Sequence, residues 1–433
     1  MTKILWEETP DERANSYMAE KFRIGLPGTT FPFIPPANKF LEHMGMPGGI
    51  AGVINSLGAS LDQPLPDPKT VRKAVNEGVP SGSFNRIQGM MDSVLSPEMH
   101  DYVTGPYLAP WMETKLHHNG LAWLCMTKGY HLRIFQADQP QTFTEQFIER
   151  RAEQELELFQ AGLEIQKYSA APEFFEERWR ETLTDFLPRH TKVEPVHIAN
   201  GLQASADLKT STGQSRSHQA GRLLGLYTRL RVDFYYQLLC NVSLDLIRWF
   251  KEKDTIAGRE QWLIENSLFG DMVPAVDGNR MMLPFERLLD TWRRKATPDN
   301  KDLSWAQIAQ CLPNPFGEDE ITSLPRGQTK EEREANIRKN KKSRLREWRD
   351  GTRPKSDQLK QFVQNLVPEE NDVSFAMMKT DIACIWGAFL IDEWATFEKC
   401  GLIGALRETL PVFESFPAYW ADYQSQAAKI IAA

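Results

Sequence analysis

Basic side chains crowd the stretch from Lys341 to Lys355, and their chemistry is the easiest in this chain to interpret. Ammonium and guanidinium groups bind phosphate oxygens, and an Arg guanidinium can also donate two parallel hydrogen bonds to the edge of a guanine. These residue types therefore favour contact with a nucleic acid or another polyanion. The candidate binding residues are Lys341, Lys342, Ser343, Arg344, Arg346, Arg349, Arg353 and Lys355.

The elements that would position these side chains are a short basic helix, a turn and a second, amphipathic helix. Leu345 and Trp348 lie three residues apart and share one face of the first helix, so basic side chains cover the rest. Gly351 ends that helix, because the cap position favours positive φ, and Pro354 prevents the helix from continuing. Ser356 is a suitable N-cap for the second helix. The expected buried face of the second helix is Leu359, Phe362, Val363 and Leu366.

The charge of the chain is unevenly distributed. Residues 326–355 hold 12 Lys/Arg and 5 Asp/Glu, a local charge of +7. The whole chain carries −7, which leaves −14 for the remainder. A single basic patch on an acidic protein is typical of a localised phosphate-binding face. The same distribution argues against nucleic-acid binding over the whole surface.

This succession of elements resembles the end of a phage-repressor-like (Cro-type) helix-turn-helix domain, over about residues 303–367. The resemblance implies a recognition helix over residues 341–350 that enters the major groove of double-stranded DNA. It covers the basic helix, the turn and the packing helix directly. The positions that carry it are Leu345, Trp348, Gly351, Pro354, Leu359 and Leu366.

The resemblance also divides the basic residues between base edges and phosphates. Residues at the start of a recognition helix usually face the bases. Arg344 lies nearer the start than Arg346, so we expect Arg344 to read a base and Arg346 to meet a phosphate or an acidic neighbour. Arg353 and Lys355 lie in the turn, where they would meet the DNA backbone.

The helix that should precede the recognition helix does not lie where the family places it. Residues 304–312 have the expected pattern, with Ser304 as N-cap, but residues 313–340 intervene. Either the turn holds an insertion, or Thr329–Asn340 is the preceding helix. We favour the insertion, because Thr329–Asn340 has very little apolar surface to bury.

The rest of the chain predicts a mainly α protein with few short strands. Apolar spacing indicates long helices over His218–Lys253 and Asp372–Phe397, whereas the polar residues 188–217 are expected to form a loop. We expect four regions. They are a Gly/Pro-rich, mixed helical region (1–140), a helical body (141–300), the helix-turn-helix domain with its insertion (301–367) and C-terminal helices that pack on the body (368–433).

Signals for catalysis and for membrane insertion are weak. No P-loop, GxGxxG, GxSxG or HExxH motif occurs. Glu113 and His117 could share a metal on one helical turn, but no third ligand has a fitting spacing, so we expect no catalytic residue, metal or cofactor. The apolar run Ile382–Ile391 is too short to cross a bilayer. Five unevenly spaced Cys and an acidic N-terminus indicate reduced thiols in a cytoplasmic protein.

Three classes of function follow from these observations. The leading one is a DNA-binding protein, such as a regulator or a component of a mobile-element or phage-defence system. Its large body would serve homodimer formation, docking of other subunits or ligand sensing. The second is a nucleic-acid-processing enzyme with an unrecognised catalytic site, and the third is a helical assembly protein that docks an acidic partner. In the simplest alternative, the basic stretch is only a solvated surface.

Overall fold

The chain is mainly α-helical, as predicted, and the described strands form one two-stranded hairpin. The computed structural model describes residues 34–46, 69, 123–124, 126–128, 141–168, 172–253, 256, 258–277, 280–295, 302–314, 329–366 and 373–432. Most of the expected N-terminal region, Glu113 and His117 included, lies outside these residues, and the four-region division stays a prediction.

Residue contacts group the chain into two units. Unit 1 comprises Met1–Ser267, Thr396–Val412 and Ala418–Ala433, and unit 2 comprises Leu268–Ala395 and Phe413–Pro417. The 3-10 helix η4 (Leu410–Glu414) and α20 (Phe416–Trp420) contribute residues to both units.

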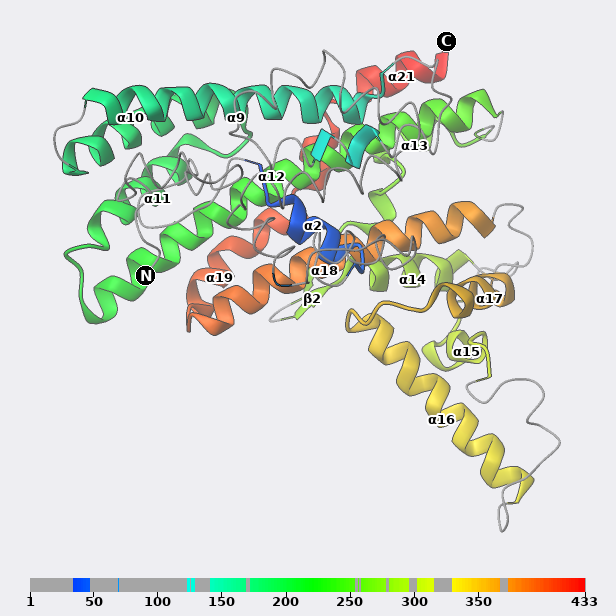
Figure 1. Cartoon of the computed structure of the whole chain (residues 1–433). Helices are drawn as coiled ribbons and strands as arrows, with labels where there is room; N and C mark the ends of the chain where they lie inside the picture. Colours follow the sequence, from blue (N-terminus) through cyan, green and yellow to red (C-terminus); the bar gives the residue numbers. More distant parts are fainter. Residues whose placement is uncertain are drawn as a thin grey trace. The chain divides into compact units, whose positions relative to one another are not determined.

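Unit 1 is built around one long helix, α12, which contacts α9, α11, α19 and α21 (Figure 1). Its sequence is apolar around most of the circumference, so neighbours cover it on several sides. The prediction of a loop over residues 188–217 was wrong, because the helix α11 forms within this range. Pro195 starts it, and Gly201 lets it approach α12, because a Cβ there would lie 2.5 Å from the Cβ of Leu226. The helices are α2 (Ala37–His43), α9 (Phe143–Tyr168), α10 (Pro172–His190), α11 (Pro195–Asp207), α12 (Gly213–Glu252), α13 (Glu260–Asn266), α19 (Ile403–Thr409) and α21 (Gln424–Ala432).

Two buried carboxylates of α12 hold its neighbours in place. Asp233 pairs with Arg151 of α9 at 2.8 Å and accepts a hydrogen bond from the Tyr419 hydroxyl at 3.2 Å. Asp245 accepts hydrogen bonds from the backbone N–H groups of Phe143 (2.7 Å) and Thr144 (3.0 Å). Asp245 therefore caps the first turn of α9 from a different helix, where free N–H groups need an acceptor.

Unit 2 contains the predicted basic helix and the helices that pack against it. The strands β1 and β2 pair antiparallel, with Ala275 opposite Met282. The apolar α18 has its last residues, 396–399, in unit 1. No helix among the described residues is long and apolar enough to cross a membrane. The elements are η2 (Gly270–Met272), β1 (Ala275–Asp277), β2 (Arg280–Met282), α14 (Pro284–Lys295), α15 (Trp305–Gln310), α16 (Lys330–Arg349), α17 (Ser356–Leu366) and α18 (Val373–Lys399).

Trp348 lies at the centre of the core that joins α14, α16 and α17. It is only 3% exposed, and its ring meets Phe362 of α17 edge-on, with centroids 5.4 Å apart. The Phe285 ring of α14 lies 6.2 Å away on another side. The inward faces predicted for α16 and α17 are confirmed, because all their residues are buried. They are Leu345, Trp348, Leu359, Phe362, Val363 and Leu366.

The pH dependence of stability should report the buried carboxyl of Asp245. Burial raises the pKa of this carboxyl from 3.8 to about 6. The folded state therefore binds the proton more tightly, and this contribution to stability is lost as pH rises through that window. Between pH 4 and pH 7, wild type should lose about 2–3 kcal/mol relative to Asp245→Asn. Urea unfolding over this range measures the difference, and parallel pH profiles for the two proteins would contradict it.

Removing the Trp348 side chain should destabilise unit 2. Trp348→Ala should lower the free energy of unfolding by roughly 3–5 kcal/mol, the usual cost of emptying a core aromatic site. Exchange of Gln361, which is exposed on α17, for Ala is the control and should change stability by less than about 0.5 kcal/mol. Thermal unfolding of both variants measures the effect, and an unchanged melting temperature for Trp348→Ala would show that the ring is not part of a cooperative core.

Candidate nucleic-acid interface

The basic helix begins eleven positions earlier in the chain than predicted. It starts at Lys330 rather than Lys341, and residues 330–340 form its first half rather than a separate preceding helix. Thr329 and Glu332 form a capping box: the Thr329 N–H donates to the Glu332 carboxylate at 2.9 Å, and the Glu332 N–H donates to the Thr329 hydroxyl at 3.2 Å. The Thr-x-x-Glu spacing is the sequence signal that would have located this start.

The helix α15 (Trp305–Gln310) forms within residues 304–312, where the sequence predicted a helix. Its N-terminus carries a capping box between Ser304 and Gln307, and α15 contacts α16. The ammonium of Lys341 donates to the backbone oxygen of Gln310 at 3.0 Å, which satisfies a carbonyl at the C-terminus of α15. Burial lowers the pKa of Lys341. Residues 315–328, the middle of the expected insertion, lie outside the described residues.

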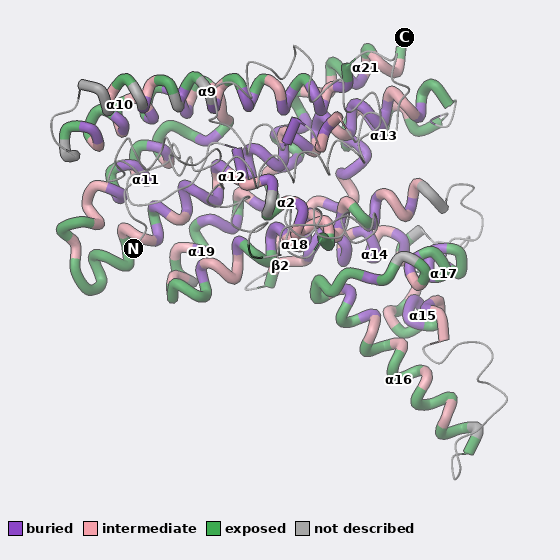
Figure 2. Tube along the Cα trace, in the orientation of Figure 1, coloured by how far each residue is buried: buried purple, intermediate pink, exposed green. Residues whose placement is uncertain are grey.

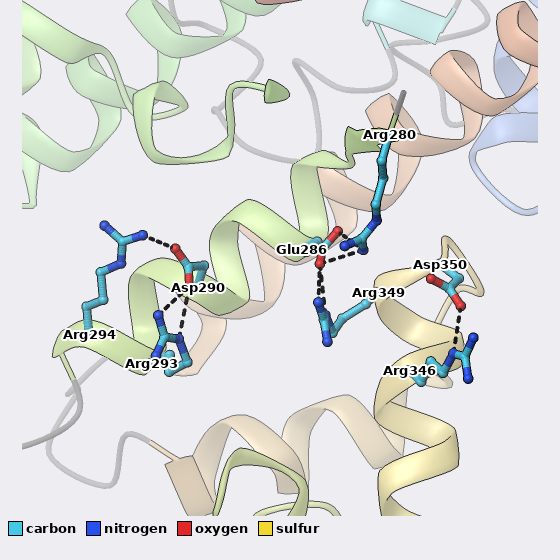
Figure 3. Close-up of polar contacts among 8 residues, drawn as sticks. All are labelled: Arg280, Glu286, Asp290, Arg293, Arg294, Arg346, Arg349 and Asp350. Atoms are coloured by element: carbon cyan, nitrogen blue, oxygen red, sulfur yellow. Dashed lines mark hydrogen bonds and ion pairs between the residues drawn. The ribbon is translucent and has the colours of Figure 1, made fainter. Parts of the chain in front are cut away.

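The C-terminal turn of α16 is fixed by a buried ion-pair cluster. Glu286 of α14 is 0% exposed, and its carboxylate accepts a hydrogen bond from the Nε of Arg349 at 2.9 Å. Arg280 donates to the same carboxylate at 2.7 and 2.8 Å (Figure 3). The Arg349 guanidinium also lies 4.0 Å from the centre of the Trp305 ring of α15. Arg349 therefore fastens α16 to both α14 and α15.

Gly351 closes α16 as predicted. Its φ is +103°, and its N–H bonds the Trp348 oxygen while the Thr352 N–H bonds the Glu347 oxygen. These two bonds form a Schellman cap. The backbone angle strains any other residue at Gly351, and a Cβ there would also require the end of the Ile391 side chain, 2.3 Å away, to move. Ser356 is the first helical residue of α17 rather than its N-cap.

The predicted binding residues fall into two groups by exposure. Lys341, Arg344 and Arg349 are half-buried, and Lys341 hydrogen-bonds to the last residue of α15. The other five are exposed, although Arg353 pairs with Asp381 at 2.9 Å and Arg346 lies 3.7 Å from Asp350. The exposed residues are Lys342, Ser343, Arg346, Arg353 and Lys355.

Sequence reasoning missed several exposed polar residues on the first half of α16. Figure 1 shows α16 extending away from α14 and α17. None of residues 331–344 is buried, as the colours of Figure 2 show along the helix. The overlooked residues are Asn336, Arg338, Lys339 and Asn340, which the predicted helix boundary excluded.

The middle of α16 carries positive charge that the described part of the chain does not neutralise. Residues 338–346 contain six Lys/Arg and no Asp/Glu. Among the described residues, none forms an ion pair with Arg338, Lys339, Lys342 or Arg344. Like charges three or four residues apart on a helix repel by a few tenths of a kcal/mol for each pair. The arrangement costs stability and creates a strong local positive potential.

The described residues offer no alternative metal chemistry. They contain no group of three or more His, Cys, Asp or Glu side chains that could hold a metal ion. The thiols of Cys311 and Cys384 have pKa values raised by burial, which keeps them protonated and unreactive. The cationic surface of α16 therefore remains the strongest candidate site in the described structure.

Arg349 and Arg346 should differ sharply when each is replaced. Arg349→Met removes hydrogen bonds to a buried carboxylate, and such bonds contribute roughly 1.5–3 kcal/mol each. Arg346→Met is the matched control on the same helix, and because Arg346 is 82% exposed its loss should cost about 0.5 kcal/mol or less. Urea unfolding of both variants measures the difference, and equal stabilities would show that the Glu286 cluster does not hold α16.

Known proteins do not identify this interface. Comparison of the chain with protein-family models, with curated proteins and with solved structures found no match to any of them.

Proposed function

We propose that the protein binds double-stranded DNA, with α16 lying in the major groove. The observation that carries the proposal is the run of cations over residues 338–346 on an exposed helix, without acidic residues or ion pairs to offset most of them within the described structure. Phosphates would remove the repulsion between these cations, and release of condensed counterions would drive association.

The dimensions of α16 suit this partner. A helix with its side chains is about 10–12 Å across, and the major groove of B-DNA is about 12 Å wide. Residues 331–344, none of which is buried, span roughly 20 Å at 1.5 Å per residue. The helix is held at its C-terminal end by the Trp348 core and the Glu286 cluster, which leaves its first half accessible.

The residues divide into binding and structural roles. Lys339, Lys342 and Arg346 are exposed and lie on one side of α16, so they are assigned to phosphates. Lys355 lies in the following turn and is exposed, which suits a contact with the DNA backbone. Arg349 is assigned to structure, because it is committed to Glu286. Compared with the binding residues predicted from the sequence, the proposed binding set therefore excludes Arg349 and includes Lys339.

The same surface would bind other polyanions less specifically. Single-stranded nucleic acid is usually held by exposed aromatic side chains, and the aromatic residue of α16, Trp348, is buried. An acidic protein partner would use the same cations without a groove. We also propose that the protein is cytoplasmic, because there it would meet DNA and its cysteines would stay reduced. The proposed function is binding alone, without a catalytic step.

Removal of two cations from α16 should weaken binding to all duplexes alike. The double variant Lys339→Gln/Lys342→Gln should lower affinity for a random duplex, and the slope of log affinity against log salt should fall by about 1 for each lost phosphate contact. Fluorescence anisotropy at several salt concentrations measures both quantities.

A matched control separates the site from overall charge. Lys253→Gln/Lys399→Gln removes the same charge from exposed positions of unit 1 and should leave affinity and slope unchanged. Equal effects of both pairs, or no effect of either, would show that α16 is a solvated surface. Tighter binding of native protein to single strands, or to polyglutamate, would point to the other partners.

A further inference from the structure

Uncharged polar residues form a row along α16 between two groups of cations. With about 100° of rotation per residue, Asn336, Asn340 and Ser343 fall within one sector of roughly 60°. We call this sector the neutral strip. Arg333 and Arg344, which are both half-buried, lie on one side of it. The exposed cations on its other side are Arg338, Lys339, Lys342 and Arg346.

The neutral strip faces away from the core of unit 2. Leu345 and Trp348 define the inward direction of α16, and Ser343, Asn336 and Asn340 lie roughly 170°, 150° and 110° from it. Asn336 and Asn340 are exposed, and neither side-chain amide hydrogen-bonds to another described residue. Glu347 closes the strip at its C-terminal end, where it accepts a hydrogen bond from Ser343 at 3.3 Å.

This arrangement matches what a helix in the major groove has to present. The centre of its outer face meets base edges, and its two flanks meet the phosphates of the two strands. An Asn side chain can make two hydrogen bonds to one adenine: its NH₂ group donates to N7, and its oxygen accepts from N6–H. Four residues of helix rise about 6 Å, and base pairs are spaced by about 3.4 Å. Asn336 and Asn340 would therefore reach bases about two steps apart.

We infer that Asn336 and Asn340 are the specificity-determining residues of this interface, each reading an adenine in the major groove about two base pairs apart. The inference rests on the proposed binding to duplex DNA. It replaces Arg344 as the expected base reader, because Arg344 is half-buried and lies outside the neutral strip. The helix start that favoured Arg344 lies at Lys330 instead.

Selection of preferred sites from a random duplex library tests the inference. Native protein should select a motif with two adenine preferences about two base pairs apart. Asn336→Ala/Asn340→Ala should lose at least about fivefold of the preference at each position, because a bidentate contact of this kind discriminates strongly between bases. Its affinity for random duplex and its salt slope should stay unchanged, since no cation is removed. Gln361→Ala/Gln364→Ala, at exposed positions of α17, is the matched control and should keep the native motif.

Each outcome separates the reading role from binding itself. Circular dichroism of the Asn variant should match native protein, because Ala favours helix more than Asn. Salt-dependent duplex binding with no motif, or with a motif that the Asn variant retains, would overturn the reading role and leave the proposed function standing. A motif that changes only in Arg344→Ala would return base reading to the arginine. Failure of native protein to bind any duplex would overturn both.

Discussion

The ion pair between Arg349 and Glu286 is the interaction on which the geometry of α16 depends. A fully buried carboxylate is strongly unfavourable unless cations and hydrogen bonds compensate it, and Glu286 has both from Arg349 and Arg280. Because the guanidinium of Arg349 is planar and donates from two nitrogens, it fixes the rotation of α16 as well as its position. The Trp348 ring and the Gly351 cap act at the same end of the helix.

A helix held at one end and exposed at the other has little apolar burial to stabilise it. Residues 331–344 contribute no buried side chain, so the capping box at Thr329 and the acidic first turn must help to maintain this half. The cations that follow oppose them by mutual repulsion. A partner that carries regularly spaced negative charge would relieve that repulsion and order the helix at the same time. If α16 binds such a partner as proposed, stability and binding are opposed in this helix.

The sequence predicted those parts of unit 2 that depend on local patterns. The apolar spacing of Leu345 and Trp348, and the requirement for positive φ at Gly351, depend on neighbours along the chain and are confirmed. The start of α16 was missed because residues 329–340 show almost no apolar periodicity, so only the capping box marks it. The pairing of Arg349 with Glu286 joins residues 63 positions apart, and no local pattern reveals such a contact. Exposure alone then separates the cations that can reach a partner from those that hold the fold.

Amide hydrogen exchange tests the central claim, that α16 is the element that contacts duplex DNA. The backbone amides of residues 331–346 lie on an exposed helix and should exchange faster than those of the buried α12. With a saturating duplex of about 20 base pairs at low salt, exchange in residues 331–346 should slow markedly, and the protection should disappear at high salt. Unchanged exchange in α16 while the duplex is demonstrably bound, or protection confined to unit 1, would contradict the account.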